Sequence, residues 1–187
     1  WVTGAEPFTS LHWLGGEGFF RWFVFDDPEW DFQSFDFDDD LTFALEKVGT
    51  AVDSNNPDLR NLRDDGSKLI VYHGWSDPQI SPANATQYYE RVSTVMGGRE
   101  KIHDSMRLFM APGMGHCAGG PGPNSFDSLT ALENWVEKDI APDSIIAVHR
   151  TDGAVDRSRP LCPYPELAVY DGSGSTDEAD NFVCRNP

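Results

Sequence analysis

Residues 106–122 read MRLFMAPGMGHCAGGPG, and the predicted fold is organised around this stretch. Its first six residues are mainly apolar and predict a buried strand, which ends in a loop rich in glycine and proline. The loop carries His116 and Cys117 at its centre. Loops at the carboxyl ends of parallel strands form the ligand-binding crevice of open α/β sheets. We therefore take His116 as the first candidate for a catalytic residue, against the alternative of an ordinary loop histidine.

A second predicted strand lies upstream, at residues 68–73. Its sequence, KLIVYH, is a continuous apolar run of the kind found in strands buried on both faces. A helix is expected to follow, with Ser81 as its N-cap, Pro82 at its first position and Gly97 at its end. This helix would connect the two strands as a crossover unit.

Downstream of the glycine-rich loop, a second helix is expected at about residues 126–138, capped by Asn124 or Ser125. A short strand at residues 144–148 follows, before a tail rich in proline and glycine. The order strand, helix, strand, helix, strand predicts the α/β fold class, with a parallel sheet and flanking helices.

Asp77 follows the first of these strands, in the turn sequence GWSDP, as His116 follows the second. Because both residues then lie at the carboxyl edge of one sheet, their side chains are expected to meet. An acid and then a histidine, each after a sheet strand, is the chain order of an α/β-hydrolase triad. The plain alternative for Asp77 is an Asx-turn, in which the carboxylate bonds its own backbone.

The nucleophile of such a triad is not found in these 187 residues. A nucleophile elbow requires the pattern G-x-S-x-G, which does not occur. Ser76 comes nearest, but Pro78 takes the place of the last glycine and lacks its N–H and its tight contour. We therefore reject Ser76 as the nucleophile.

The composition excludes several classes of function. With 31 acidic and 14 basic residues the net charge is -17, which repels nucleic acid phosphates and anionic lipid head groups. No apolar run of about 18 residues occurs, so no membrane span is expected. The chain opens on Trp1 without a signal peptide and is expected to be a processed or truncated product. Its three cysteines imply, in an oxidising compartment, one pair and one thiol committed elsewhere.

The first forty residues combine aromatic and acidic side chains. The aromatic residues of segment 1–24 follow no sustained period, apart from a short strand or helix expected at 19–25, and either pack or line an apolar pocket. Segment 26–40 is acidic, but Leu41 and Lys47 stand where a calcium-binding EF-hand loop needs Gly and Glu. We expect instead an extended segment with its aromatic side chains inward and its acids solvated, and then a helix at about 41–48 capped by Asp40.

Five blocks cover nearly the whole chain: FFRWFVFDDPEWDFQSFDFDDDL, KLIVYHGWSDPQISP, RLFMAPGMGHCAGGPGP, LTALENWVEKDIAPDSI and RSRPLCPYPELAVYDGSGS. Together, and in this order, they resemble the C-terminal half of the tannase and feruloyl esterase family. The resemblance implies the C-terminal portion of an α/β-hydrolase fold, with residues 1–25 as the end of an inserted lid domain and 26–187 in the catalytic domain. It also implies that Asp77 and His116 are the catalytic acid and base.

In that family the catalytic serine lies in a C-S-x-G-G elbow, and a disulfide joins the cysteine before it to the cysteine after the histidine. The resemblance therefore implies that Cys117 bonds a cysteine outside this chain, on an N-terminal portion of the same enzyme. The family's lid calcium site would lie on that portion, and no cofactor or metal is expected within this chain. Ile80 falls where relatives place an apolar residue beside the acyl ring. Further substrate contacts are expected among Trp13, Phe19, Phe20 and Trp22.

The expected activity is hydrolysis of a small ester of an aromatic acid through an acyl-serine. His116 would accept the serine proton and return it to the leaving alcohol, while Asp77 holds the histidine tautomer. Feruloyl-type esters are favoured by the resemblance, with galloyl esters and terephthalate monoesters as alternatives. A rival from another class is a noncatalytic binding module whose acidic, aromatic-rich surface docks a polysaccharide or a protein. Neither nucleic acid nor a membrane is an expected partner.

The remaining predictions concern covalent modification and location. Cys162 and Cys184 flank a tail too rich in glycine, proline and serine to be held by burial, and we predict a disulfide between them. Asn84 opens a glycosylation sequon, which is meaningful in a eukaryotic secretory host. We expect a secreted protein, extracellular or periplasmic. Three histidines without a partner pattern are expected to be surface or packing residues, namely His12, His103 and His149.

Overall fold

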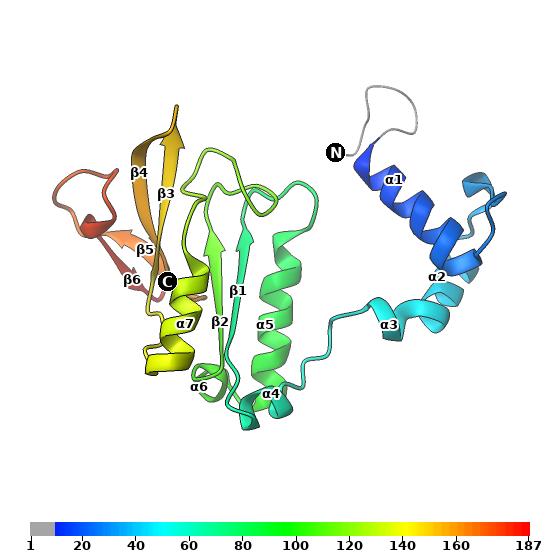
Figure 1. Cartoon of the computed structure of the whole chain (residues 1–187), viewed down its shortest axis with the longest axis horizontal. Coiled ribbons are helices and arrows are strands. Elements are labelled where there is room, and N and C mark those ends of the chain that lie inside the picture. Colours follow the sequence, from blue (N-terminus) through cyan, green and yellow to red (C-terminus); the bar gives the residue numbers. More distant parts are fainter. Residues whose placement is uncertain (1–9) are drawn as a thin grey trace. The chain divides into compact units, whose positions relative to one another are not determined.

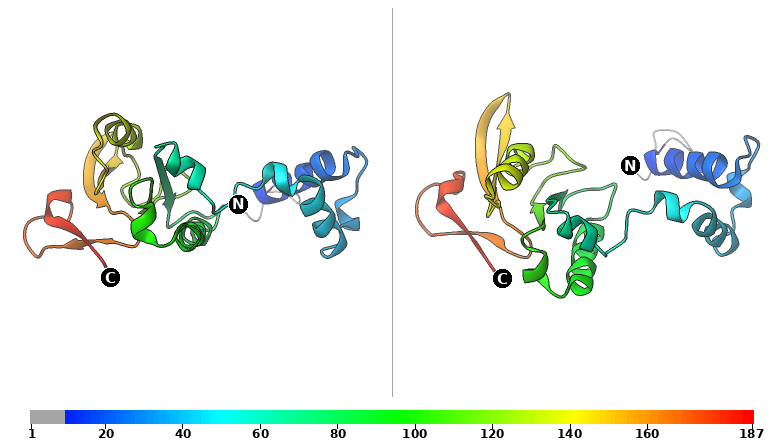
Figure 2. Two further views of the ribbon diagram at one scale, coloured as in Figure 1. Left: turned by 90° about the horizontal axis from the view of Figure 1, so that it is seen from below. Right: turned by 60° about the horizontal axis from the view of Figure 1, so that its bottom comes forward.

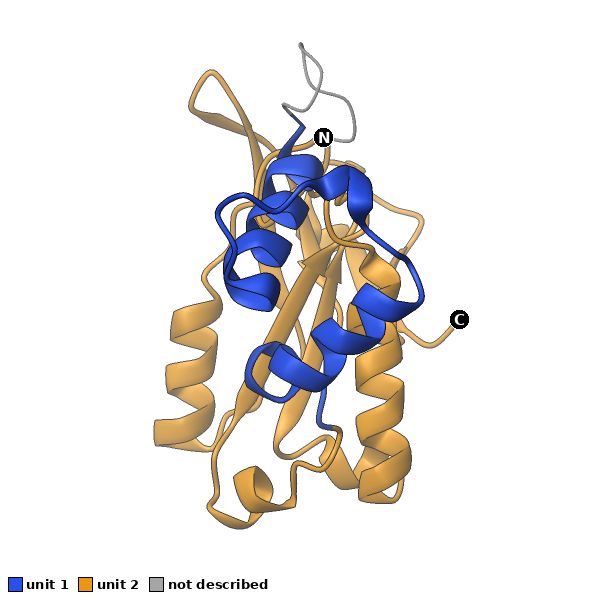
Figure 3. Cartoon of the chain, turned by 90° about the vertical axis from the view of Figure 1, so that its right-hand side faces the viewer, with its two compact units in different colours: residues 1–56 blue, residues 57–187 orange. Residues whose placement is uncertain are grey.

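The computed structural model describes residues 10–187, and the chain divides into two compact units, Trp1–Asn56 and Pro57–Pro187 (Figure 3). The first unit therefore ends at Asn56, whereas the lid segment expected from the sequence ends at residue 25. The assignment of residues 1–25 to a lid stays a prediction, and its first nine residues lie outside the described part of the chain. Of the described helices, none has both the length and the apolarity needed to cross a bilayer.

The described part of the first unit is helical. Helix α1 (Leu11–Gly18) begins at Ser10, whose hydroxyl accepts a hydrogen bond from the N–H of Trp13 at 3.1 Å. It runs into the π-helical segment η1 (Phe19–Phe25), so the short element expected at residues 19–25 is a helix. The later elements are η2 (Phe32–Ser34), α2 (Asp39–Ala44), the π-helical η3 (Leu45–Gly49) and α3 (Thr50–Val52).

The acidic segment at residues 26–40 is not extended, which corrects the sequence-based expectation. The carboxylate of Asp31 accepts the N–H of Gln33, and that of Asp36 accepts the N–H of Asp38. Such local bonds from carboxylate to backbone favour turns over strand-like structure. Phe37 is 80% exposed, so the expectation of inward-facing aromatic side chains is wrong there. The following helix, α2, has Asp38 rather than Asp40 at its N-cap position.

A pair of parallel strands forms the centre of the second unit (Figure 1). Strand β1 (Leu69–Gly74) pairs with β2 (Met106–Ala111), with Gly74 opposite Ala111 at the carboxyl ends. The connection runs through helix α5 (Pro82–Met96), which ends at Gly97 in the left-handed conformation, and the short α6 (Arg99–Ile102). A further short helix, α4 (Arg60–Asp64), precedes β1. The two strands and the helix between them lie where the sequence predicts them.

The side chains of β2 alternate between two apolar clusters, as the period of a strand requires. Met106, Leu108 and Met110 pack in one cluster with residues of α5, including Tyr89 and Val92. In the other cluster, β2 packs against the strands β3 (Ile145–Thr151) and β4 (Ala154–Leu161). Its members include Phe109, Ala111, Ile145, Ala147 and Leu161. Because both faces of β2 are covered, every one of its residues is buried.

Helix α7 (Ser128–Lys138) lies across the β1–β2 pair from α5 (Figure 1). Its cap is Asp127, whose carboxylate accepts the N–H of Thr130 at 2.9 Å. The expectation of Asn124 or Ser125 as cap is therefore wrong. The N–H groups of both residues donate instead to the carbonyl of Val148, each at 3.1 Å, and this draws the segment before the helix alongside β3.

The end of the chain corrects the expected parallel topology. Strand β3 (Ile145–Thr151) forms an antiparallel hairpin with β4 (Ala154–Leu161), and β5 (Leu167–Tyr170) pairs antiparallel with β6 (Phe182–Arg185), which follows η4 (Ala179–Asn181). Asp152 and Gly153 close the first hairpin with φ of 51° and 84°, the residue types that such turns prefer. Figure 2 shows the β5–β6 ribbon beside the hairpin. The predicted disulfide between Cys162 and Cys184 is present and ties the end of β4 to β6.

Candidate active site

Backbone hydrogen bonds join the loops that leave the carboxyl ends of β1 and β2. The N–H of Trp75 donates to the carbonyl of Ala111 at 3.0 Å, and the N–H of Ser76 donates to that of Met114, also at 3.0 Å. The second loop is thereby held against the first. Two residues far apart in sequence, Asp77 and His116, are brought to the same edge by these hydrogen-bonded segments.

The close approach of these loops explains the glycine at the end of β1. A Cβ atom on Gly74 would lie 2.2 Å from the carbonyl oxygen of Met114 and 2.4 Å from that of Gly115, far inside van der Waals contact. Within the second loop, Gly120 has φ of 94°, and a Cβ there would lie 2.2 Å from the carbonyl oxygen of Gly113. Glycine at positions 74 and 120 is therefore a packing requirement of the site.

Asp77 is the buried acid of the site, with its side chain 1% exposed. Its Oδ1 accepts hydrogen bonds from the backbone N–H groups of Gln79, at 2.8 Å, and Ile80, at 2.9 Å. This is the local turn that the sequence analysis raised as the plain alternative, and it engages one carboxylate oxygen. The other oxygen, Oδ2, faces away from the turn and contacts histidine.

The nitrogen Nδ1 of His116 lies 2.8 Å from Oδ2 of Asp77, and its side chain is 36% exposed. Burial of the carboxylate acts to raise the pKa of Asp77. Hydrogen bonds from two backbone N–H groups and from His116 outweigh it and lower that pKa to about 2. Asp77 is therefore ionised at neutral pH, and its contact holds the His116 proton on Nδ1. In that tautomer Nε2 is the basic nitrogen, which is the arrangement of a general base and its orienting acid.

A second histidine contacts the same carboxylate, and sequence reasoning missed it. Nε2 of His73, in β1, lies 3.1 Å from Oδ2 of Asp77 and 3.1 Å from the carbonyl oxygen of Ile80. The available signal was a histidine at the end of a predicted strand, four residues before the acid.

The other predicted site residues of the second unit occupy exposed positions. The side chain of Ile80 is 42% exposed, and its backbone is bound to Asp77 as described above. Cys117 is exposed, carries a free thiol in this chain and has φ of 61°. Asn84 is exposed in the first turn of α5, where a glycan would have access to solvent.

The four predicted substrate-contacting aromatic residues all belong to the first unit. The ring of Trp13 packs edge-on against Phe32, with centroids 5.6 Å apart. Phe19 and Phe20 also meet edge-on, at 5.3 Å, and Phe20 belongs to a larger group of rings. Trp22 differs from the others in being 55% exposed. The described structure therefore leaves the indole of Trp22 accessible, while the other three rings serve packing within the unit.

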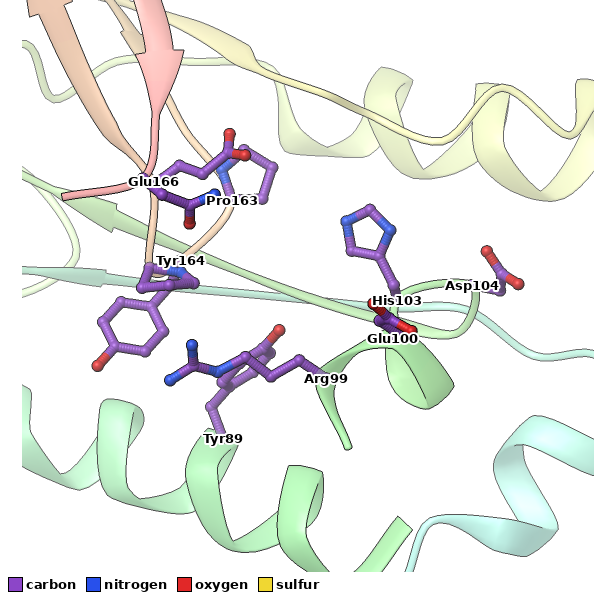
Figure 4. A pocket seen from close by; sticks show the side chains of 10 residues that line it. Tyr89, Arg99, Glu100, His103, Asp104, Pro163, Tyr164 and Glu166 are labelled. Atoms are coloured by element: carbon purple, nitrogen blue, oxygen red, sulfur yellow. The ribbon is translucent and has the colours of Figure 1, made fainter. Parts of the chain in front are cut away.

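The cavity shown in Figure 4 does not include Asp77 or His116. Within residues 10–187, no group of three or more His, Cys, Asp and Glu side chains is arranged to hold a metal ion. A cavity of about 300 Å³ lies at the amino end of β2, where Arg99 extends from α6 toward Tyr164 (Figure 4). Tyr89 and His103 also line it. Asp77 and His116 lie instead in the loops after β1 and β2.

Comparisons of the sequence with known proteins agree on one family. The family model of tannase and feruloyl esterase matches residues 9–185. The mono(2-hydroxyethyl) terephthalate hydrolase of Piscinibacter sakaiensis is 46% identical over 137 residues, covering 72% of this chain and 22% of that protein. A probable feruloyl esterase B-2 of Aspergillus terreus is 32% identical over 202 residues, covering 98% of this chain and 37% of that protein. The chain thus spans well under half the length of these relatives.

Solved structures show the same fold. An esterase from Aspergillus oryzae superposes with a TM-score of 0.81 at 32% identity, covering 90% of this chain and 37% of that chain. Feruloyl esterase B from the same organism gives a TM-score of 0.80 at 27% identity, covering 90% and 36%. The similarity to these α/β esterases is consistent with an α/β-hydrolase-like fold for this chain.

Proposed function

This chain belongs to the tannase and feruloyl esterase family, and from that membership we propose that it supplies the acid and base of a Ser-His-Asp triad in a carboxylic ester hydrolase. The observation that carries the proposal is the 2.8 Å contact between His116 Nδ1 and Asp77 Oδ2, at the carboxyl ends of two parallel strands. A buried, ionised acid beside a partly exposed imidazole suits the two roles, since only the imidazole has to reach the reacting atoms.

In the proposed reaction, His116 Nε2 accepts the proton of a serine hydroxyl as that oxygen attacks the ester carbonyl. The imidazolium formed is stabilised by the Asp77 carboxylate and then gives its proton to the departing alcohol oxygen, which leaves an acyl-serine. His116 next takes a proton from water, whose oxygen attacks the acyl carbon, and returns it to the serine oxygen. The products are the free acid and the alcohol, and no redox step occurs.

The proposed substrate is a small ester of an aromatic acid, with feruloyl-type esters first and galloyl esters or terephthalate monoesters as alternatives. The names of the matched relatives support this class, because they include feruloyl and terephthalate ester hydrolases. Ile80 is the proposed contact for the acyl ring. Its backbone is hydrogen bonded to the proposed catalytic acid, and the residue is exposed. Of the four proposed aromatic contacts, Trp22 has the most accessible ring.

We place the serine, and the family's lid calcium site, on a portion of the enzyme outside these 187 residues, and the enzyme outside the cytoplasm. Cys117 is the proposed link to that portion, because it directly follows His116, is exposed and is not part of the Cys162–Cys184 disulfide. Peptide mapping of the whole gene product without reduction should join Cys117 to a cysteine outside this chain. The Cys162–Cys184 peptide pair serves as the positive control. Recovery of Cys117 as a free thiol beside an intact control pair would contradict the link.

The activity is tested on the whole gene product that contains this chain. Feruloyl, galloyl and terephthalate monoesters are assayed side by side, and a fluorophosphonate probe is used to label an activated serine. We expect hydrolysis of at least one aromatic ester and a labelled serine outside residues 1–187. A label on Ser76 would overturn the assignment of the nucleophile. Absence of both hydrolysis and labelling would favour the noncatalytic binding module.

A further inference from the structure

We infer that His73 is a positioning residue, which locks the Asp77 carboxylate in the orientation that His116 requires. The inference rests on the proposed function, because it assigns His73 a place in the same acid–base pair. It starts from the two contacts of His73 Nε2, one to Asp77 Oδ2 and one to the carbonyl oxygen of Ile80, both at 3.1 Å.

These two contacts determine which nitrogen of His73 carries a proton. A carbonyl oxygen and an ionised carboxylate oxygen both accept hydrogen bonds and cannot donate them. Nε2 of His73 must therefore be an N–H group, which donates to the Ile80 carbonyl and lies in contact with Asp77 Oδ2. The ring thus presents a polar N–H group beside the Asp77 carboxylate whether or not its other nitrogen is protonated.

Polar N–H groups surround the Asp77 carboxylate. Oδ1 receives two backbone N–H groups, Oδ2 receives His116 Nδ1, and His73 Nε2 lies 3.1 Å from Oδ2. Because the side chain of Asp77 is 1% exposed, water has little access to replace a missing polar group. Loss of the His73 N–H would remove this contact from a buried charge and leave the Ile80 carbonyl without its donor, so the carboxylate could rotate together with its turn.

His73 also holds the loop that carries the acid. The N–H of Ile80 donates to Asp77 Oδ1 while the carbonyl of the same residue accepts from His73. His73 therefore contacts the acid and is hydrogen bonded to the residue that ends its turn. This arrangement resists a rotation of the carboxylate away from His116.

The test compares two variants of the whole gene product. His73→Phe keeps a ring of similar size but removes the donor, whereas His73→Gln keeps a side-chain N–H at about the reach of Nε2. We expect His73→Phe to lower kcat roughly 10- to 100-fold, the range typical of supporting hydrogen bonds around reactive groups, with KM within about twofold. His73→Gln should recover kcat to within about threefold of the parent. Equal losses in the two variants, or a parental kcat in His73→Phe, would overturn the inference.

The matched controls are His149→Phe and His149→Gln. His149 also binds an aspartate, with Nδ1 2.6 Å from Oδ1 of Asp156, but lies in the β3–β4 hairpin. Both controls should keep the parental kcat and show how much activity a histidine substitution costs by itself. Thermal unfolding of all four variants checks that each one folds.

A second measurement separates this inference from the proposed function. The His116 Nδ1–H proton, assigned by its absence from His116→Ala, is followed by NMR of histidine-labelled protein. Its resonance should shift or broaden in His73→Phe and return in His73→Gln, even if the parent hydrolyses no ester. An unchanged resonance in His73→Phe would contradict the positioning role whatever the activity.

Discussion

Two histidine–aspartate pairs in the second unit have nearly the same contact geometry and different surroundings. His116 lies 2.8 Å from Asp77, and His149 lies 2.6 Å from Asp156, in both cases through Nδ1 of the imidazole. The first pair joins loops at the carboxyl ends of parallel strands, and the second spans an antiparallel hairpin. The shorter contact thus belongs to the pair for which no catalytic role is proposed.

The surroundings of the two acids are what distinguish the pairs. The side chain of Asp77 is 1% exposed, whereas that of Asp156 is 42% exposed. Besides His149, Asp156 accepts a hydrogen bond from the hydroxyl of Thr151, and these two bonds lower its pKa. In water-exposed pairs of this kind the attraction is screened and contributes little to stability. Burial and the number of donors, rather than contact distance, therefore distinguish the acid that is proposed to orient a catalytic base.

The largest expected difference between the two pairs is the loss of kcat when the histidine is replaced. In the whole enzyme, His116→Ala should lower kcat roughly 10⁵- to 10⁶-fold, the scale measured for triad histidines, because proton transfer is lost in both half-reactions. His149→Ala should change kcat by less than about twofold. Steady-state kinetics on the best aromatic ester measures both. Similar losses in the two variants would erase the functional distinction between the pairs.

Replacement of the two acids should give a nearly equally large difference in turnover. Asp77→Asn keeps the shape of the side chain but favours the wrong tautomer of His116, which in serine proteases costs roughly 10⁴-fold in turnover. Asp156→Asn, the same chemical change in the exposed pair, should leave turnover near the parental value. Substrate binding, read from KM, should move far less than kcat in Asp77→Asn. Retention of most turnover by that variant would mean that another acid orients His116.

Glycine substitutions test the loops that carry the two pairs. Gly74→Ala places a methyl group 2.2 Å from the Met114 carbonyl and should displace the His116 loop, lowering the free energy of unfolding by about 3 kcal/mol and reducing activity. At Gly153 no atom lies within 4 Å of an added Cβ, but φ is 84°. Gly153→Ala should therefore cost only about 1 kcal/mol, from left-handed strain, and leave activity intact. Urea unfolding and ester hydrolysis are measured on both variants. A larger loss of stability or activity in Gly153→Ala than in Gly74→Ala would contradict the close packing of the two loops at Gly74.

The smallest expected effect is the pH dependence of stability. The pKa of Asp77 is about 2 in the folded protein, below its ordinary value of 3.8. A lowered carboxyl pKa stabilises the fold above pH 4, and that stabilisation is lost as pH falls through about 2. The free energy of unfolding should therefore drop less steeply between pH 4 and pH 2 in Asp77→Asn than in the parent. Asp156→Asn should change this slope less, because its carboxylate is solvated; the opposite ranking would argue against the burial difference.

Local sequence patterns predict the elements that position the proposed site. The apolar runs at residues 68–73 and 106–111 differ from β1 and β2 by at most one residue at an end, and Pro82 and Gly97 bound α5. These signals are local, since strand burial, a proline at a helix start and a left-handed glycine at its end depend on neighbouring residues. The antiparallel hairpin could also be predicted from the sequence, because Asp152-Gly153 between strand-like segments is a strong turn signal. The sequence-based prediction of a parallel strand overlooked this signal.

The sequence by itself therefore determined the two strands, the helix between them, and the placement of Asp77 and His116 after the strand ends. It could not show that Asp77 divides its oxygens between a local turn and His116, nor that the side chain of His73 turns back to contact the acid. The first of these features depends on the distance between loops nearly forty residues apart, which is set by backbone bonds such as that from Ser76 to Met114. Burial likewise arises only when the loops pack, so the difference between Asp77 and the equally paired Asp156 was decided by the tertiary structure.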